Sequence, residues 1–281
     1  MTPLTWRVEN PSGQNRVIVT KEIPGERWLQ LLNNADCRVE ICQSSRVLET
    51  TDIKDALGKR CDGAIGQLTE RWGEELFSTL KAAGGRAYSN YAVGYNNVEL
   101  EAASRYGIPV GNTPGVLTET TAEMAVALTF ATARRIGEAE RYLRDGQFHG
   151  WLPTLFQGEL LNRKTVGVIG AGRIGAAYAR MMVAALRMNL VYFDLYKNKE
   201  LEEFIRSYSQ FLASYGEPPV TCRQVDNVDE LLNEADCISL HTILDDSTRH
   251  LINAKRLKNM KRSAILVNTS RGPVIDEAAL V

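Results

Sequence analysis

The chain lacks a long hydrophobic run, a charge excess of either sign and a paired cysteine motif. No apolar stretch among its 281 residues approaches the roughly 18 residues that a membrane-spanning helix needs. Lys and Arg total 33 against 34 Asp and Glu, so the net charge is −1, which argues against a nucleic-acid or anionic-membrane partner. Residues 1–10 contain neither an apolar signal core nor an Arg-rich presequence.

The five cysteines are odd in number, widely spread and contain no CxxC pair. Most lie in apolar, strand-like runs, which is typical of buried thiols in a reducing compartment. No His or Cys cluster has metal-ligand spacing, so we expect no metal site. The hydrophobic share of 44% and charged share of 24% are ordinary for a globular protein, and the length allows two domains. These features favour an intracellular two-domain enzyme.

The first part of the chain alternates short apolar runs with helical segments. The expected strands are Arg16–Thr20, Cys37–Cys42, Cys61–Ile65, Arg86–Tyr88 and Ile108–Val110. The expected helices pass through Trp28 and Leu32 and cover residues 52–57, 74–82 and 97–106. Strands separated by helical patterns predict βαβ units and a parallel sheet. We therefore expect a first α/β domain over residues 1–118.

A turn cluster, Asn112-Thr-Pro-Gly115, marks the expected crossing between domains. Thr120 followed by Glu123 matches the capping box, in which each side chain accepts from an unpaired backbone N–H. This pattern predicts one long helix from residue 120 to about residue 145. A helix of that length after a domain crossing either bridges two domains or packs in a dimer interface, and we expect both roles.

The second part of the chain, residues 119–281, predicts a doubly wound parallel sheet. Its expected strands are Lys164–Ile169, Asn189–Phe193, Pro219–Cys222, Cys237–Leu240 and Ala264–Val267. Helices are expected between them, over residues 174–185, 201–215, 228–234 and 254–259. Ligands of such sheets bind at the carboxyl ends of the strands.

The segment Gly170-Ala-Gly172-Arg-Ile-Gly175 matches the dinucleotide pattern G-x-G-x-x-G. It follows an apolar strand and opens a helix, and Asp194 comes 19 residues after Gly175, where an acid would bind the adenosine ribose. Gly170 permits the tight turn, Gly172 lets backbone N–H groups approach the pyrophosphate, and Gly175 lets the helix lie close to the sheet. Because Asp194 would repel a 2′-phosphate, the expected cofactor is NAD(H). Arg173 lies near the cofactor, where contact with the pyrophosphate accounts for it.

A second constellation is Asn268–Asp276, which follows the last expected strand and contains Arg271. An Arg at this edge can hold a substrate carboxylate and polarise the adjacent carbonyl. His241 follows another strand at the same edge, and the sequence leaves open whether it contacts the nicotinamide side or only ends the strand. His149 and His250 lie in polar loops, and no histidine is placed convincingly as a general acid.

These motifs together resemble the D-isomer-specific 2-hydroxyacid dehydrogenases. The resemblance runs from Arg16 to Val281, and Ser89–Asn97 and Gly111–Glu123 are among its most specific stretches. It implies an α/β fold with a flavodoxin-like substrate domain and a Rossmann-type dinucleotide-binding domain. Within the family, the chain is similar to the plant-type peroxisomal subgroup, which reduces hydroxypyruvate to D-glycerate with NADH in photorespiration and also reduces glyoxylate. The resemblance thus implies a peroxisomal location and a small 2-keto acid substrate.

Site residues carried over from the family fall on both domains. Val93 and Gly94 match the loop whose backbone N–H groups hold the substrate carboxylate, and Arg271 matches the catalytic, substrate-binding arginine. Trp151 matches a loop that reaches the partner subunit's active site in a homodimer. The positions that match cofactor contacts, besides the three glycines, are Arg173, Ile174, Asp194, Thr242, Thr248 and Thr269.

The family's catalytic Glu and His lie in segments that follow the last residue of this sequence, so we expect the 281 residues alone to bind NADH but to turn over slowly. Phosphohydroxypyruvate and formate are less favoured substrates, because the basic residues or loop they need are not evident. Two alternatives stay open: a catalytically incomplete fragment that only binds NAD, and an NAD-sensing transcriptional co-repressor, which would need a peptide groove in the first domain.

Overall fold

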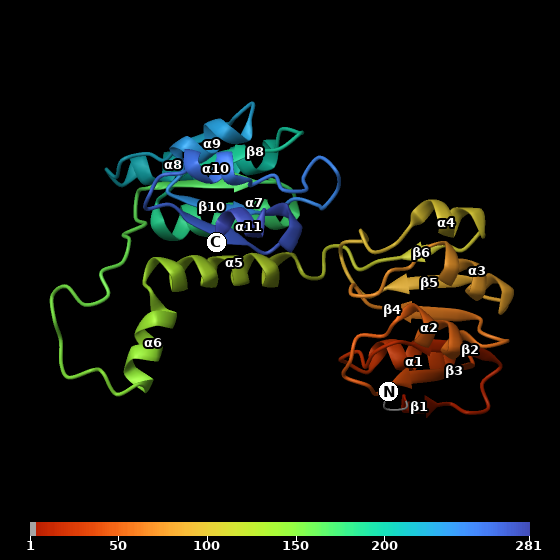
Figure 1. Ribbon diagram of the computed structural model, residues 1–281. Coiled ribbons are helices and arrows are strands. Elements are labelled where there is room, and N and C mark those ends of the chain that lie inside the picture. Colours follow the sequence, from red (N-terminus) through yellow and green to blue (C-terminus); the bar gives the residue numbers. More distant parts are fainter. Residues whose placement is uncertain (1–3) are drawn as a thin grey trace. The chain divides into compact units, whose positions relative to one another are not determined.

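The computed structural model describes residues 4–281, which divide after Gly115 into two compact units (Figure 1). Residues 1–3, where the expected first domain begins, lie outside the described residues. Each unit is built on its own sheet with helices packed against it, so the predicted two-domain α/β fold class is confirmed.

The first unit contains a six-stranded sheet in the order β1-β3-β2-β4-β5-β6. All neighbours are parallel except β1, which runs antiparallel to β3 and pairs Trp6 with Cys42. Without β1 the strand order is that of a flavodoxin-like fold. Sequence reasoning missed β1, because its short, partly polar run has no buried face. The strands are β1 (Trp6–Glu9), β2 (Asn15–Val19), β3 (Cys37–Cys42), β4 (Gly63–Gly66), β5 (Ala87–Asn90) and β6 (Val110–Gly111).

Helices cover both faces of this first sheet. One face packs against α1, and the other packs against the remaining helices around a cluster that contains Trp72, Phe77 and Tyr88. The Trp72 and Tyr88 rings are stacked, with centroids 4.0 Å apart. The helices are α1 (Arg27–Asn34), α2 (Thr50–Leu57), α3 (Glu74–Ala82) and α4 (Leu100–Arg105).

The second unit contains a five-stranded, fully parallel sheet in the order β11-β10-β7-β8-β9. The order reverses between β7 and β10, which is the switch point where doubly wound sheets bind ligands. Strand β9 was expected over residues 219–222 but begins at Cys222. Pro218 and Pro219 have no backbone N–H that could donate a hydrogen bond to the neighbouring strand. The strands are β7 (Thr165–Ile169), β8 (Asn189–Phe193), β9 (Cys222–Gln224), β10 (Cys237–Leu240) and β11 (Ile265–Asn268).

Figure 1 shows helices on both faces of this second sheet. Helices α5, α7 and α8 share one apolar core with the sheet, and α9 and α10 share the other. A short 3-10 turn, Gly272–Val274, and α11 follow the last strand, and the Asp276 side chain caps α11 by accepting from the Ala279 N–H. The helices are α5 (Thr118–Ala133), α6 (Ile136–Arg144), α7 (Arg173–Leu186), α8 (Lys199–Ser214), α9 (Val228–Glu234), α10 (Ala254–Asn259) and α11 (Glu277–Leu280).

The prediction of one long helix over residues 120–145 is wrong. Helix α5 begins at Thr118, and Thr120 donates its hydroxyl to the Leu117 carbonyl instead of capping the helix. The chain then breaks at Arg135, which adopts a left-handed conformation with φ 53°. Ion pairing of Arg135 with Glu138 and its position over the Phe156 ring hold the chain in this turn.

The cysteines within the described residues are free thiols, and all but Cys222 are buried, as expected for a reducing compartment. Within residues 4–281, none of the helices combines the length and the apolar character that a bilayer crossing requires.

Candidate functional site

The register of the second sheet brings four strand ends to one edge. Ile169 at the end of β7 pairs with Phe193 of β8 and with Leu240 of β10, and Leu240 pairs with Asn268 of β11. The next residue of each strand therefore stands at the same carboxyl edge. These residues are Gly170, Asp194, His241 and Thr269.

The three motif glycines are required for different geometric reasons. Gly170 has φ +90°, which L side chains rarely adopt, and a Cβ there would lie 2.8 Å from the His241 carbonyl carbon. A Cβ on Gly175 would lie 2.0 Å from the Gly170 oxygen, so α7 can approach the loop only without one. A Cβ on Gly172 would meet no protein atom within 4 Å. Gly172 therefore leaves an open space at the start of α7, where an anion can approach the helix N-terminus.

Asp194 is held against this glycine loop by backbone donors. Its carboxylate accepts from the Ala171 N–H at 2.7 Å and from the Tyr196 N–H at 3.0 Å. The Asn198 amide donates to the Ala171 carbonyl at 2.7 Å and ties α8 to the same loop. The acid thus lies beside the loop, at the position that a ribose-binding carboxylate needs.

A cavity of about 480 Å³ opens at the switch point. It brings together Gly170, Gly172, Asp194, Thr242 and Thr248 of the predicted cofactor residues. Arg173, Ile174 and Gly175 lie in the first turn of α7 and are not part of its lining. Sequence reasoning missed several lining residues, because they lie after β9, in the segment between β10 and α10, or in the first turn of α10, and carry no motif. Those residues include Asp226, Asn227, Val228, Leu251 and Arg256.

The two cavity threonines differ in the hydrogen bonding of their hydroxyls. The Thr242 Oγ1 atom is buried and has no hydrogen-bond partner among the described residues. Thr248 Oγ1 donates to the Ile243 carbonyl at 2.8 Å and accepts from the Asp245 N–H at 2.9 Å, so it closes a turn of the loop after β10. Thr242 is thus the hydroxyl left to bind a ligand.

His241 lines the cavity. Its Nε2 lies 2.9 Å from the Ser239 hydroxyl, and its ring packs near Tyr178 with centroids 5.3 Å apart. Burial lowers the pKa of His241 from 6.5 to about 4. The imidazole is therefore neutral at pH 7.

Arg271 belongs to a second hollow, of about 470 Å³, at the end of β11. Asn268 shapes this turn, because its amide donates to the Arg271 carbonyl at 2.8 Å while its carbonyl accepts from the Ser270 N–H at 2.9 Å. Burial lowers the pKa of the half-buried Arg271. Thr269 lines the same hollow, and its buried Oγ1 has no hydrogen-bond partner among the described residues.

Val93 and Gly94 lie in the loop after β5 of the first unit. Their carbonyls accept from side-chain amides, Val93 from Asn112 at 2.9 Å and Gly94 from Asn90 at 3.0 Å. No acceptor among residues 4–281 pairs with the backbone N–H of Val93 or Gly94. Both N–H groups are therefore unpaired within the described residues.

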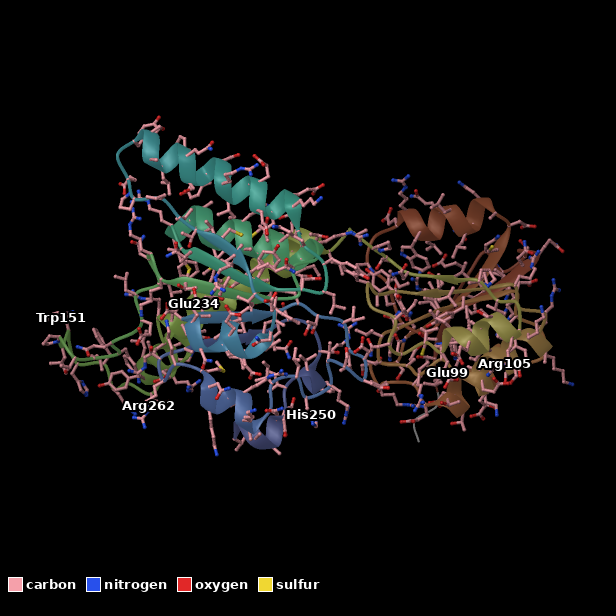
Figure 2. The ribbon with its side chains drawn as sticks, turned by 90° about the horizontal axis from the view of Figure 1, so that it is seen from above. Glu99, Arg105, Trp151, Glu234, His250 and Arg262 are labelled. Carbon is pink, nitrogen blue, oxygen red and sulfur yellow. The ribbon has the colours of Figure 1, made fainter. Side chains whose placement is uncertain are left out.

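Trp151 lies in the loop between α6 and β7, with 81% of its surface exposed. Figure 2 shows it at the end of a loop that extends away from the sheet of its own unit. The structure therefore does not bring Trp151 together with the cavity residues of the same chain.

The residues of the switch point fit a dinucleotide. A pyrophosphate and a ribose would use three features of this site. These are the open space at Gly172, the fixed carboxylate of Asp194 and the unpartnered hydroxyl of Thr242. Among the described residues, no three His, Cys, Asp or Glu side chains gather as a metal site would require.

Comparison with known families agrees with this geometry. Residues 126–281 match the NAD binding domain of the D-isomer specific 2-hydroxyacid dehydrogenases, and residues 17–186 match the catalytic domain of the same family. The chain belongs to this family of NAD-dependent dehydrogenases. The family resemblance, the enzyme class and the NAD(H) cofactor predicted from the sequence are thereby confirmed.

Among characterised relatives, the chain is 60% identical to the peroxisomal glycerate dehydrogenase of Arabidopsis thaliana, over 99% of this chain and 72% of that protein. It is also 60% identical to the glycerate dehydrogenase of Cucumis sativus, over 99% of this chain and 73% of the relative. A glyoxylate reductase of Korarchaeum cryptofilum is 39% identical, over 94% and 74% of the two chains.

Solved structures share the fold. The TT0316 protein of Thermus thermophilus matches with a TM-score of 0.80 and 36% identity, over 94% of this chain and 76% of that chain. The D-lactate dehydrogenase of Aquifex aeolicus, solved with NAD and lactic acid, matches with a TM-score of 0.75 and 27% identity, over 95% and 72%.

Proposed function

We propose that the protein reduces hydroxypyruvate to D-glycerate with NADH, and glyoxylate to glycolate as a second activity. The observation that carries the proposal is the 60% identity to two glycerate dehydrogenases over 99% of the chain. Relatives that are glyoxylate reductases support the second activity. Because these relatives are enzymes, the co-repressor alternative is not favoured.

Cofactor binding in this proposal rests on the switch point. The N–H groups of the glycine loop and the N-terminus of α7, with Arg173 and Ile174 in its first turn, hold the pyrophosphate. Asp194 accepts from the adenosine ribose hydroxyls, and its charge disfavours a 2′-phosphate. Thr242 provides a hydroxyl from the opposite side of the cavity. When bound, NADH supplies the hydride that the reduction needs.

Substrate binding rests on two groups that recognise a 2-keto acid. The backbone N–H groups of Val93 and Gly94 hold the carboxylate, and they are suited to it because the described residues leave them unpaired. Arg271 stabilises the negative charge that develops on the carbonyl oxygen as the carbon is reduced. Its half-buried position strengthens this interaction, since fewer waters compete for the guanidinium.

Proton donation to the substrate is the step for which the histidines of this chain are poorly placed. His241 is neutral at pH 7, whereas His149 and His250 are exposed and do not line the cavity. We therefore expect the 281 residues alone to bind NADH and hydroxypyruvate but to turn over slowly. Rapid hydroxypyruvate-dependent oxidation of NADH by this chain would contradict the expectation about rate, though not the proposed substrate.

The substrate role of Arg271 is tested by titrating hydroxypyruvate into the NADH complex and following NADH fluorescence. We expect Arg271→Ala to weaken hydroxypyruvate binding by at least about tenfold, because a charge-assisted hydrogen bond is lost. The affinity of the Arg271→Ala variant for NADH should change little. Arg249→Ala, at an exposed arginine outside both hollows, is the matched control. Equal hydroxypyruvate affinity in the parent and Arg271→Ala would contradict the role.

We further propose that the protein is a peroxisomal homodimer. The location is supported by the name of the Arabidopsis relative. Dimerisation is supported by exposed apolar side chains on α5 and α6 and by the exposed Trp151, which would reach the partner's site. Imaging of the protein in plant cells, tagged at its N-terminus, tests the location.

A further inference from the structure

The loop that carries Val93 and Gly94 is fastened by groups from the segment that follows β6. Asn112 Nδ2 donates to the Val93 carbonyl at 2.9 Å, and the Thr113 N–H donates to the Ala92 carbonyl at 2.9 Å. Both donors lie just after β6, and β6 pairs in parallel with β5, the strand that leads into the loop. Two successive carbonyls of the loop are therefore held by two successive residues of the neighbouring segment.

Peptide geometry turns these contacts into an orientation of the N–H groups. In a planar trans peptide, the carbonyl of one residue and the N–H of the next point in opposite directions. Holding the Val93 carbonyl therefore sets the direction of the Gly94 N–H. Holding the Ala92 carbonyl sets the Val93 N–H in the same way. The two N–H groups proposed to bind the carboxylate are thus the two whose peptide planes this segment fixes.

The far side of the loop is fixed by buried amides. Asn90, which is fully buried, donates from Nδ2 to the Gly94 carbonyl at 3.0 Å. Asn97 Nδ2 donates to the Glu70 carbonyl at 2.9 Å and to the Gln67 carbonyl at 3.2 Å, which anchors the loop to the segment after β4. These anchors do not reach the Val93–Gly94 peptide, whose carbonyl is held by the Asn112 side chain.

Asn112 differs from these anchors because it is exposed. Its one hydrogen bond to the loop is the bond to the Val93 carbonyl. An exposed hydrogen bond adds little to stability. Its effect on the direction of the Gly94 N–H, however, does not depend on that stability contribution.

We propose that Asn112 is a positioning residue for substrate binding, which acts by holding the Val93 carbonyl so that the Gly94 N–H points at the substrate carboxylate. The inference rests on the proposed function, since it presumes a 2-keto acid at this loop. Asn112 itself does not touch the substrate in this account.

The test is Asn112→Ala in the full chain, with Asn162→Ala as the matched control. Asn162 is likewise exposed and donates from Nδ2 to a distant backbone carbonyl, that of Leu186, at 3.2 Å. We expect Asn112→Ala to weaken hydroxypyruvate binding to the NADH complex about tenfold, as for one misdirected hydrogen bond to a charged group. The affinity for NADH and the urea midpoint should match those of the parent.

The outcomes separate the inference from the proposed function. A parent chain whose NADH complex does not bind hydroxypyruvate would contradict the proposed function and, with it, the inference. A parent that binds hydroxypyruvate, with Asn112→Ala and Asn162→Ala indistinguishable in affinity, would overturn the inference alone. Unchanged hydroxypyruvate affinity in Asn112→Ala together with a lower urea midpoint would also overturn it, because the hydrogen bond would then be structural only.

Discussion

His241 is a partly buried histidine that lines the cavity at the switch point, and its surroundings determine how the protein responds to acid. The ring lies between Ser239 and Tyr178, and burial favours the neutral form, with a pKa of about 4 against the ordinary 6.5. In the unfolded chain this histidine takes up a proton as the pH falls below 6.5, whereas in the folded chain it stays neutral until about 4. The unfolded state therefore binds more protons between these values, and stability falls with pH.

We expect this histidine to cost about 2 kcal/mol of folding free energy at about pH 5 relative to about pH 7.5. His241→Gln keeps a partner for Ser239 and removes the titration. Urea unfolding of the parent and His241→Gln at both pH values measures the difference. An identical pH dependence in the two proteins would show that His241 is not buried in its neutral form.

Residue positions were predictable where a sequence motif requires a particular backbone geometry. The spacing of the three glycines and Asp194 predicted their positions around the β7–α7 turn, because the motif encodes a tight turn and a close approach. The surroundings of His241 and the hydroxyl of Thr248 could not be predicted, since burial and turn closure depend on residues distant in sequence. The same holds for Asn112, whose contact with Val93 joins segments on neighbouring strands.

The β7–α7 turn is the element on which the proposed cofactor binding depends, and substitutions of its glycines distinguish effects on folding from effects on binding. Gly175→Ala places a Cβ 2.0 Å from the Gly170 oxygen and 3.1 Å from Val168 Cγ1, so α7 must move. We expect it to lower the free energy of unfolding by about 2 kcal/mol or more and to weaken NADH binding.

Gly172→Ala meets no protein atom within 4 Å and has an ordinary φ of −70°, so it provides the matched comparison. Its stability should stay within about 0.5 kcal/mol of the parent. Its NADH affinity should fall more than about tenfold, because the Cβ fills the space that the pyrophosphate needs. Thermal unfolding and NADH titration check both variants. A Gly172→Ala protein that binds NADH like the parent would place the pyrophosphate elsewhere.

Strands and helices were predictable to different degrees, for physical reasons. Buried parallel strands such as β8 and β10 form continuous apolar runs, so their bounds could be predicted from composition. The break between α5 and α6 was not predicted, because the basic pair Arg134 and Arg135 and the nearby Gly137 lie inside an apolar-periodic segment that continues to Leu143. Contacts with Glu138 and Phe156 stabilise the left-handed residue only in the folded chain.

At the scale of the whole molecule, the exposed apolar side chains of α5 and α6 lead to a prediction about assembly. Met124 and Leu128 lie one turn apart on α5, and Ile136 and Leu143 lie on one side of α6, with between 41% and 62% of their surfaces exposed. Exposed apolar patches of this kind mark protein–protein contacts.

We expect the protein to sediment as a dimer at micromolar concentration and the double variant Leu128→Glu, Leu143→Glu to sediment as a monomer. Phe211→Glu is the control, since Phe211 is 55% exposed but lies on α8. Analytical ultracentrifugation distinguishes the species. A monomeric parent, or a double variant that remains dimeric, would contradict the assignment of this interface.

A paired titration of the parent chain with NADH and NADPH, each with and without hydroxypyruvate, tests whether the protein uses NADH to reduce hydroxypyruvate. We expect NADH to bind at least about tenfold more tightly than NADPH, because Asp194 repels the 2′-phosphate. Hydroxypyruvate should tighten NADH binding further. Equal affinity for the two cofactors, together with no response to hydroxypyruvate, would contradict the proposed function.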